Sequence, residues 1–179
     1  MSAELYFFAL SLPFAKLGGV GPCGNSGGLN TVTATVGPLA NSGRPAFEQV
    51  QNRRALRLRG TVSLAQNGGF LQVARVLDCD GPSGFDARAY DGLLLDVCGV
   101  PGPYFMHLRT SDTRAPWQYY AAPLTVSTSW HEVHLLWSAF TPSALRAPLA
   151  IDRLQRIGIV AAQAAFHADI AVSRIAFTP

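Results

Sequence analysis

Short runs in which apolar and polar residues alternate dominate the chain after Arg44. Successive side chains of a β-strand point to opposite faces, so this period of two predicts strands that each bury one face. Ile175 and Phe177 continue the last run on the opposite parity, which predicts a β-bulge near Ser173. The apolar positions of the runs are Leu56, Leu58, Val62 and Leu64; Leu93, Leu95 and Val97; Tyr104, Met106 and Leu108; Val133, Leu135 and Trp137; Ile157 and Ile159; and Phe166, Ala168, Ile170 and Val172.

Turn residues separate these runs. The connecting stretches "QNGG", "DGPSG", "GVPGP", "TSDTRAP" and "FTPSALRAP" carry the Gly, Pro, Asn and Asp that chain reversals favour. Only "IDRLQR" has a helical pattern, which predicts one short helix near residues 152–156 with Asp152 as its N-cap. Short, regular strands without long helices between them predict an all-β fold, an antiparallel β-sandwich or jelly roll.

Residues 61–77, "TVSLAQNGGFLQVARVL", contain two apolar runs joined at Asn67-Gly68. An Asn-Gly pair adopts positive φ at little steric cost, so it suits the two-residue type I′ turn of a β-hairpin. The sequence therefore predicts a hairpin whose strands run from about Ala55 to Leu64 and from Phe70 to Val76.

The first part of the chain differs from the rest in composition. Residues 17–43 include no charged side chain and are rich in Gly, Ser, Thr and Asn, which is typical of loops and weakly specified strands. We therefore divide the chain into a divergent, charge-poor N-terminal segment, residues 1–43, and a β-sandwich domain, residues 44–179. The segment is expected to be partly disordered or to supply an edge strand.

Composition excludes several classes of protein. Hydrophobic residues make up 49% of the chain and charged residues 14%, which is a globular composition. The net charge of +3 is mild and no run of five or more like charges occurs, so no nucleic-acid partner is expected. The three cysteines show no CxxC spacing, which favours free thiols over a disulfide framework or a zinc site, with a Cys79–Cys98 bridge as the alternative in an exported protein.

The apolar run near the N-terminus is too short to span a bilayer and lacks a basic flank, so neither a membrane span nor a signal peptide is expected. These features favour the cytoplasm of a bacterium, or the mitochondrion if the source is eukaryotic. Export is the minor alternative.

No motif of catalysis or metal binding stands out. The chain lacks a GxSxG elbow and a Gly-rich phosphate loop before a helix, so we expect neither an enzyme nor a cofactor. His131 and His134 have HxxH spacing, but on a strand they point to opposite faces, and no shared metal is expected. "DCDGPSGFD" resembles a calcium loop only faintly because it lacks EF-hand spacing, so its Asp residues are interpreted as turn residues.

Aromatic and polar side chains gather in the middle of the chain. Phe105, His107 and Arg109 fall on one face of a strand, and Gln118 and Tyr120 would lie beside Arg109 if the next strand pairs with it. Such a group suits a sugar or a protein hot spot, and the alternative is ordinary cross-strand pairing. Arg75 is added because its strand can reach the same face. The candidate binding residues are Arg75, His107, Arg109, Gln118 and Tyr120.

The order of motifs is more specific than any one of them. The series reads "RALRLRGTVSLAQNGGFLQVAR", "YDGLLLDVCG", "YFMHLRT", "PWQYYAAPL", "SWHEVHLLWSAFTP", "RIGIVA" and "FHADIAVSRI". The chain resembles the CIA30 family, the complex I intermediate-associated protein 30 domain, over roughly residues 44–177. One departure lies ahead of these motifs, where Thr31 and Val32 are kept but the Met-Gly-Gly usual in the family is missing. The matching positions are Gly60, Asn67, Gly68, Gly69, Phe70, Tyr90, Asp91, Gly92, Arg109, Gln118, Tyr120, Trp130, Phe140, Pro142, Gly158, Phe166 and Ile175.

The resemblance implies a galactose-binding-domain-like β-sandwich, related in fold to carbohydrate-binding modules. Mitochondrial members of the family assist assembly of respiratory complex I, and many bacterial members have no settled activity. The resemblance therefore implies a non-enzymatic, chaperone-like domain whose protein partner is a subunit or assembly intermediate of a respiratory complex. The alternative is a sugar binder similar to a carbohydrate-binding module, with a glycan as its ligand.

Overall fold

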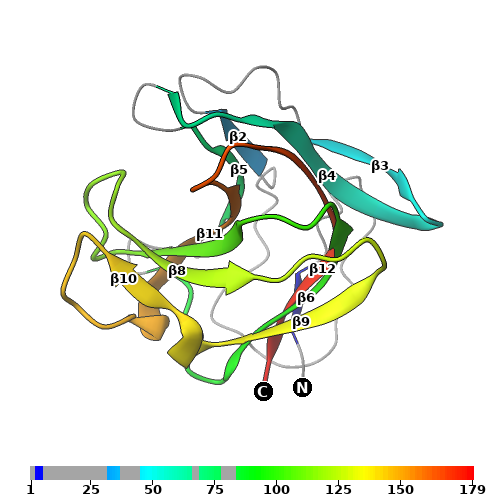
Figure 1. Cartoon of the computed structure of the whole chain (residues 1–179). Helices are drawn as coiled ribbons and strands as arrows, with labels where there is room; N and C mark the ends of the chain where they lie inside the picture. Colours follow the sequence, from blue (N-terminus) through cyan, green and yellow to red (C-terminus); the bar gives the residue numbers. More distant parts are fainter. Residues whose placement is uncertain (1–2, 6–31, 37–44, 66–68, 78–83) are drawn as a thin grey trace.

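A computed structural model describes residues 3–5, 32–36, 45–65, 69–77 and 84–179, which form two antiparallel sheets packed face to face (Figure 1). We name them the β12 sheet and the β7 sheet after their central strands. The β12 sheet has the order β3 (Ala46–Val50), β4 (Arg53–Val62), β12 (Phe166–Thr178), β6 (Gly92–Gly99) and β9 (His131–Leu136), with β1 (Ala3–Leu5) paired to β12. The β7 sheet has the order β10 (Thr141–Ser143), β8 (Tyr119–Leu124), β7 (Tyr104–Thr110), β11 (Leu154–Ala161), β5 (Leu71–Val76) and β2 (Val32–Val36).

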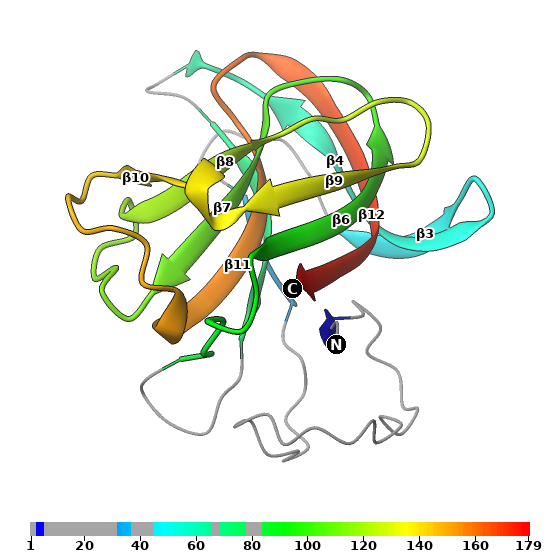
Figure 2. The ribbon, with the colours of Figure 1, turned by 90° about the horizontal axis from the view of Figure 1, so that it is seen from below.

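The all-β antiparallel sandwich predicted from the alternating runs is confirmed. Figure 2, turned by 90°, shows β8 and β10 on one side of the molecule and β3 and β12 on the other. The predicted bulge is also present, because the pairing of β12 with β6 shifts register between Val172 and Arg174. Ile175 and Phe177 therefore stay buried although their parity changes, since the extra residue turns the strand back toward the core.

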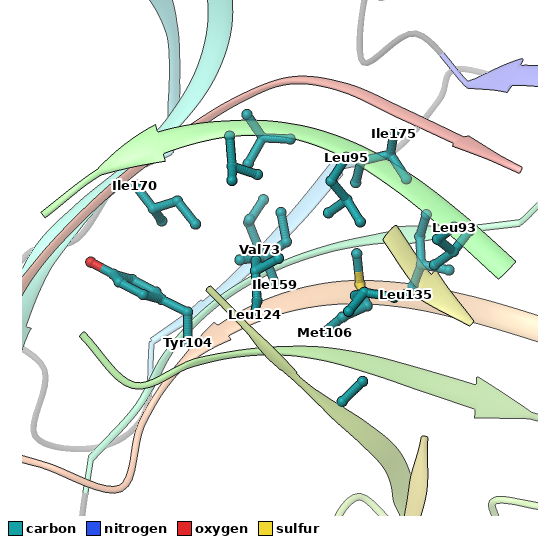
Figure 3. Close-up of a cluster of buried hydrophobic side chains, with 14 of the residues drawn as sticks. Val73, Leu93, Leu95, Tyr104, Met106, Leu124, Leu135, Ile159, Ile170 and Ile175 are labelled. Atoms are coloured by element: carbon teal, nitrogen blue, oxygen red, sulfur yellow. The ribbon is translucent and has the colours of Figure 1, made fainter. Parts of the chain in front are cut away.

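Inward side chains of both sheets fill the space between the layers. Figure 3 shows Leu93 and Leu95 of β6 and Ile170 of β12 opposite residues of the β7 sheet such as Met106 and Ile159. All of these side chains are at most 1% exposed. Tyr104 of β7 also lies in this core, and its hydroxyl oxygen accepts a 3.0 Å hydrogen bond from the backbone N–H of Asp169 in β12.

The predicted hairpin at Asn67-Gly68 is wrong in its pairing. Both strands exist close to their predicted bounds, but β4 pairs with β3 and β12 whereas β5 pairs with β11 and β2. The two strands therefore lie in different layers. Near their ends, the Gly69 N–H donates a 2.6 Å hydrogen bond to the Ser63 carbonyl. A period of two shows which side of a strand is buried but not in which sheet the strand lies. The Asn67-Gly68 turn itself lies outside the described residues.

The helical prediction holds only in part. A single 3-10 turn, η3 (Ile151–Arg153), precedes β11, and the predicted helical residues from Leu154 onward belong to the strand. The N-cap residue is Ala150, and Asp152 makes an ion pair with Arg153 in place of a capping bond. Apolar residues on the inward side of β11 outweigh the short helical pattern. A second 3-10 turn, η2 (Trp137–Ala139), follows β9.

The division of the chain at residue 43 stays a prediction. Within residues 1–43, Ala3–Leu5 pair with the C-terminal part of β12 and Val32–Val36 form an edge strand of the β7 sheet. The other residues of that segment lie outside the described part of the chain.

A small apolar cluster lies on the outward side of the β12 sheet. Ala55, Cys98 and Ala171 are buried there beneath Val50 and Trp130. The Trp130 indole N–H donates a 3.2 Å hydrogen bond to the Val50 carbonyl, which holds the ring over the cluster. Cys98 is a free thiol, and its pKa is raised because burial disfavours the thiolate.

None of the helices in the described ranges has the length and apolar character that crossing a bilayer requires.

A candidate binding face on the β7 sheet

The outward side of β7 carries the first candidate residues. Phe105, His107 and Arg109 are half-buried there, while Tyr104, Met106 and Leu108 alternate with them in the core. This is the division of faces that the sequence predicts. The question is then which side chains of the neighbouring strands share the outward side with His107 and Arg109.

Tyr120 does not lie on that face. It pairs with Leu108, shares its inward direction and is 0% exposed. Its hydroxyl donates to the carbonyl oxygens of Ala147 and Pro148, at 3.2 and 2.9 Å, so the phenol anchors the loop after β10. The predicted position of Tyr120 beside Arg109 is therefore wrong.

Tyr119 takes that place. Its ring stacks on the imidazole of His107, with centroids 4.0 Å apart and planes 12° from parallel. "QYYAA" contains two adjacent tyrosines, and the direction of each depends on the register between β7 and β8. No local pattern in the sequence fixes that register.

Arg109 and Gln118 organise the loop between β7 and β8. Arg109 donates from Nε to Thr113 Oγ1 at 3.2 Å and from Nη2 to the Thr113 carbonyl at 2.9 Å and the Ala115 carbonyl at 3.1 Å. Gln118 Oε1 accepts from the backbone N–H groups of Arg114 and Ala115, at 2.9 and 3.1 Å. The loop held in this way carries Trp117, which is 66% exposed.

Arg75 lies apart from the other candidates. Its register partner on β11 is Ile157, a core residue, so Arg75 has the inward parity of β5 together with Val73. Gln72 and Ala74 have the outward parity instead. The structure therefore brings His107 and Arg109 together, places Gln118 in the adjoining loop, and leaves Arg75 and Tyr120 on the other side of the sheet.

Arg156 is an outward residue that the sequence analysis did not single out. It pairs in register with Arg109, so two guanidinium groups stand on neighbouring strands. The pKa of Arg156 is lowered, first by burial and then by the charge of Arg109. Its Nε atom is buried and has no hydrogen-bond partner in the part of the chain that the structure describes. The alternation of Arg156 with Ile157 and Ile159 could have shown that it points outward.

Several polar atoms on this face are unused. Burial lowers the pKa of His107 to about 4, so its ring is neutral near pH 7. Within the described ranges, nothing hydrogen-bonds to the His107 nitrogens or the Tyr119 hydroxyl, and no carboxylate faces Arg156. We define the binding face as His107, Arg109, Tyr119 and Arg156, with Trp117 on the adjoining loop.

Other polar groups that the sequence drew attention to are engaged locally. His131 contacts the Ser127 hydroxyl at 3.0 Å and the Thr125 carbonyl at 3.1 Å, and His134 lies 3.7 Å from Glu132. Asp86 pairs with Arg88, which lowers its pKa to about 2, while Asp78 and Asp80 lie outside the described residues. No group of three or more potential metal ligands occurs among the residues that the structure describes.

A shallow hollow of about 510 Å³ lies beside η3, and its lining includes none of the binding face residues. Arg153 lines it and pairs with Asp112 at 3.8 Å and Asp152 at 3.2 Å. The charges around this hollow therefore neutralise one another, which makes it a weaker candidate than the binding face.

Solved structures with a similar fold include carbohydrate-binding modules. The family 11 module of a cellulosomal cellulase of Clostridium thermocellum matches with a TM-score of 0.70 at 14% identity, over 99% of this chain and 94% of that chain. The same family's module from that organism in complex with a β-1,3-1,4-mixed-linked tetrasaccharide gives 0.63 at 12% identity, over 85% and 90%. A family 30 module gives 0.57 at 13% identity, over 83% and 94%. At these identities the likeness shows the fold alone.

A search of curated protein sequences found no match. A family model does match, over residues 27–171, which is most of the chain and includes every residue of the binding face. The family is described as complex I intermediate-associated protein 30. The chain belongs to the CIA30 family.

Proposed function

We propose that the protein is a non-catalytic binding domain that holds a partner polypeptide during assembly of a respiratory complex. Membership of the CIA30 family supports a role in assembly of a respiratory complex, because the family is named for an intermediate of complex I. The observation that carries the proposal is the binding face, where aromatic rings and unpaired polar atoms lie together. Such a role would be performed in the bacterial cytoplasm or, in a eukaryote, in the mitochondrion.

The residue types of the binding face favour a polypeptide. Trp, Tyr and Arg are the residues most enriched in the energetic centres of protein interfaces. Here Trp117 is 66% exposed, and Arg109 holds the loop that carries it. Tyr119 is held by its stack on His107. A rigid aromatic surface loses little conformational entropy on binding, which increases affinity.

The test is affinity capture of respiratory subunits. We expect the tagged chain to recover defined respiratory subunits or assembly intermediates from detergent-solubilised membranes of the source organism. Trp117→Ala and Tyr119→Ala should lose that recovery, since both remove an aromatic contact. Phe47→Ala is the matched control, because Phe47 is a 39% exposed aromatic residue on β3 of the other sheet. Undiminished recovery by Tyr119→Ala would contradict the proposal.

A glycan ligand is the second candidate. The specific observation in its favour is a stacked pair of rings on a sandwich whose structural neighbours include carbohydrate-binding modules. Two results together would favour a glycan over a polypeptide as the ligand. The protein would bind reproducibly to a glycan array and lose this binding in Tyr119→Ala, and capture from membranes would recover no respiratory subunit. The array is therefore run with the same set of variants.

A further inference from the structure

The cross-strand pair of Arg109 and Arg156 is unfavourable as it stands. Like charges directly opposite each other on neighbouring strands repel. The two residues are register partners, and the charge of Arg109 lowers the pKa of Arg156. Burial of the Arg156 Nε atom without an acceptor adds a desolvation cost. A structural role for Arg156 would require a partner, and the described part of the chain supplies none.

The two arginines are not equivalent. Arg109 already donates to Thr113 and Ala115 from Nε and Nη2, which holds its guanidinium in one position. Arg156 Nε, by contrast, has no acceptor among the described residues. An acceptor that lies between them would therefore contact the fixed guanidinium of Arg109 and the N–H donors of Arg156. This arrangement suits the two oxygens of a carboxylate.

Half-buried arginines on the other sheet show what such a group normally does. Arg57 binds the Asp169 carboxylate through Nε and Nη2, both at 2.6 Å. Arg174 binds Asp96 at 2.9 Å and Glu132 at 3.2 Å. On the β12 sheet the chain thus provides a carboxylate for both partly buried arginines. No carboxylate of the described residues pairs with Arg156, which points to one supplied from outside.

We propose that Arg109 and Arg156 form a receptor for an Asp or Glu side chain of the partner polypeptide, so that the partner docks through an acidic segment with aromatic neighbours. This inference rests on the proposed function, because it identifies the chemistry of the polypeptide that the binding face holds. A neutral sugar would leave both positive charges uncompensated, whereas one carboxylate relieves their repulsion. The stacked Tyr119 and the exposed Trp117 would contact the apolar parts of the same segment.

The probe is a ten-residue peptide of alternating Glu and Tyr, compared with the same peptide carrying Gln in place of Glu. Titration calorimetry of the full chain should show binding of the Glu peptide that weakens with added salt and is lost with the Gln peptide. Arg156→Gln should weaken it at least about tenfold, since a charge-assisted hydrogen bond contributes about 1.5–3 kcal/mol. Arg156→Lys should recover only part, because Lys keeps the charge but not the fork.

Arg59→Gln is the matched control. It removes the same charge from the outward side of the β12 sheet, where Arg59 pairs with Glu48. Its affinity for the Glu peptide should stay within about twofold of the original protein, as expected for a charge remote from the ligand. Equal weakening by Arg59→Gln and Arg156→Gln would show general electrostatic attraction and would overturn the receptor.

The melting midpoint of Arg156→Gln distinguishes a binding role of Arg156 from a structural one, because the two roles predict changes in opposite directions. Arg156→Gln relieves a like-charge pair and a buried unpaired donor, so its melting midpoint should equal or exceed that of the original protein. A clear fall of the midpoint would identify Arg156 as a scaffold residue and overturn the proposal.

Two further outcomes separate this receptor from the proposed function. Capture of respiratory subunits that persists in Arg156→Gln refutes the receptor and leaves the assembly role intact. Failure of the original protein to capture any subunit refutes the assembly role, and the Glu and Gln peptides then decide the receptor by themselves. Binding of polygalacturonate without binding of the Glu peptide would overturn the polypeptide in favour of an acidic glycan.

Discussion

On the outward side of the β12 sheet, Arg57 makes two 2.6 Å hydrogen bonds to the Asp169 carboxylate, whereas on the outward side of the β7 sheet Arg156 stands opposite Arg109. The first sheet also pairs Arg59 with Glu48 and Arg174 with Asp96. On the second sheet, within the described residues, rings stack and polar atoms remain unused. Both sheets contribute buried apolar side chains to the core, so the contrast lies in what faces away from it.

This difference separates stabilising charges from charges that await a ligand. A carboxylate beside each half-buried guanidinium lowers the free energy of the folded state. Two guanidinium groups without a carboxylate raise it, and natural sequences tolerate such conflicts mainly at functional sites. The β12 sheet is therefore interpreted as the structural side of the sandwich, and the β7 sheet as the side that binds.

The largest expected loss of stability comes from the inward tyrosine of β8, Tyr120, and should far exceed the loss from the outward tyrosine, Tyr119. Tyr120→Ala should lower the free energy of unfolding by about 3–5 kcal/mol, because it leaves a cavity and two unpaired carbonyl groups. Tyr119→Ala removes one half-buried ring and should cost about 1 kcal/mol. Urea denaturation of the two variants measures both, and equal losses would contradict the assignment of their faces.

Acid should weaken the fold through His107. Its pKa of about 4 lies below the value of 6.5 expected in the unfolded chain, so the unfolded state takes up the proton first as the pH falls. The stability that neutral His107 provides is complete above about pH 6.5 and is lost toward pH 4, at most about 3 kcal/mol. Urea denaturation of His107→Gln across this window should show a shallower decline. His134→Gln, which alters an exposed histidine, should keep the original slope.

The charge network of the β12 sheet should respond next. Asp169→Asn should lower the free energy of unfolding by about 1–2 kcal/mol, because Arg57 loses a charged acceptor that it binds through two donors. A double-mutant cycle with Arg57→Met isolates the pair from the other effects of each substitution. A coupling energy near zero would show that this face is not stabilised by its charges, and the contrast between the two sheets would then fail.

The smallest effect is expected at the exposed rim of the same network. Arg59→Gln breaks an ion pair with Glu48 in which Arg59 is 49% exposed, and it should change the free energy of unfolding by less than about 0.5 kcal/mol. Thermal melts at low and high salt should coincide within error for this variant and the original protein. If Arg59→Gln lowered the free energy of unfolding as much as Asp169→Asn, the contribution of these ion pairs would not depend on their exposure.

Much of the fold was predictable because burial leaves a period-two pattern. Strands β4, β6, β7, β9, β11 and β12, their buried sides and the bulge near Ser173 follow from that period. Leu64, which is 53% exposed, and Trp137, which lies in η2, fall outside the strands whose series they were expected to continue. The assignment of β4 and β5 to different sheets did not follow, because Leu58 and Val73 face the same core from opposite layers. Local sequence carries no information about which layer a strand joins.

The binding face was predictable only along single strands. His107 and Arg109 were placed together correctly because both lie on β7. Tyr119 and Tyr120 were exchanged because the choice depends on the register between β7 and β8. Arg156 was missed because its significance comes from pairing with Arg109 across two strands, although the two residues lie far apart in the sequence. Contacts between strands determine which polar groups remain unpaired, and these contacts exist only in the folded chain.

The hydrogen bond from the Asp169 N–H to Tyr104 has a consequence for how the layers move. Apolar packing is non-directional, so a core of aliphatic side chains alone would allow one layer to slide slightly across the other. A hydrogen bond is directional, and this one joins the middle strand of each sheet. Asp169 also holds Arg57, so the outward charge network, the core and β7 are connected through one residue. The orientation of the binding face is thereby fixed relative to the opposite surface of the sandwich.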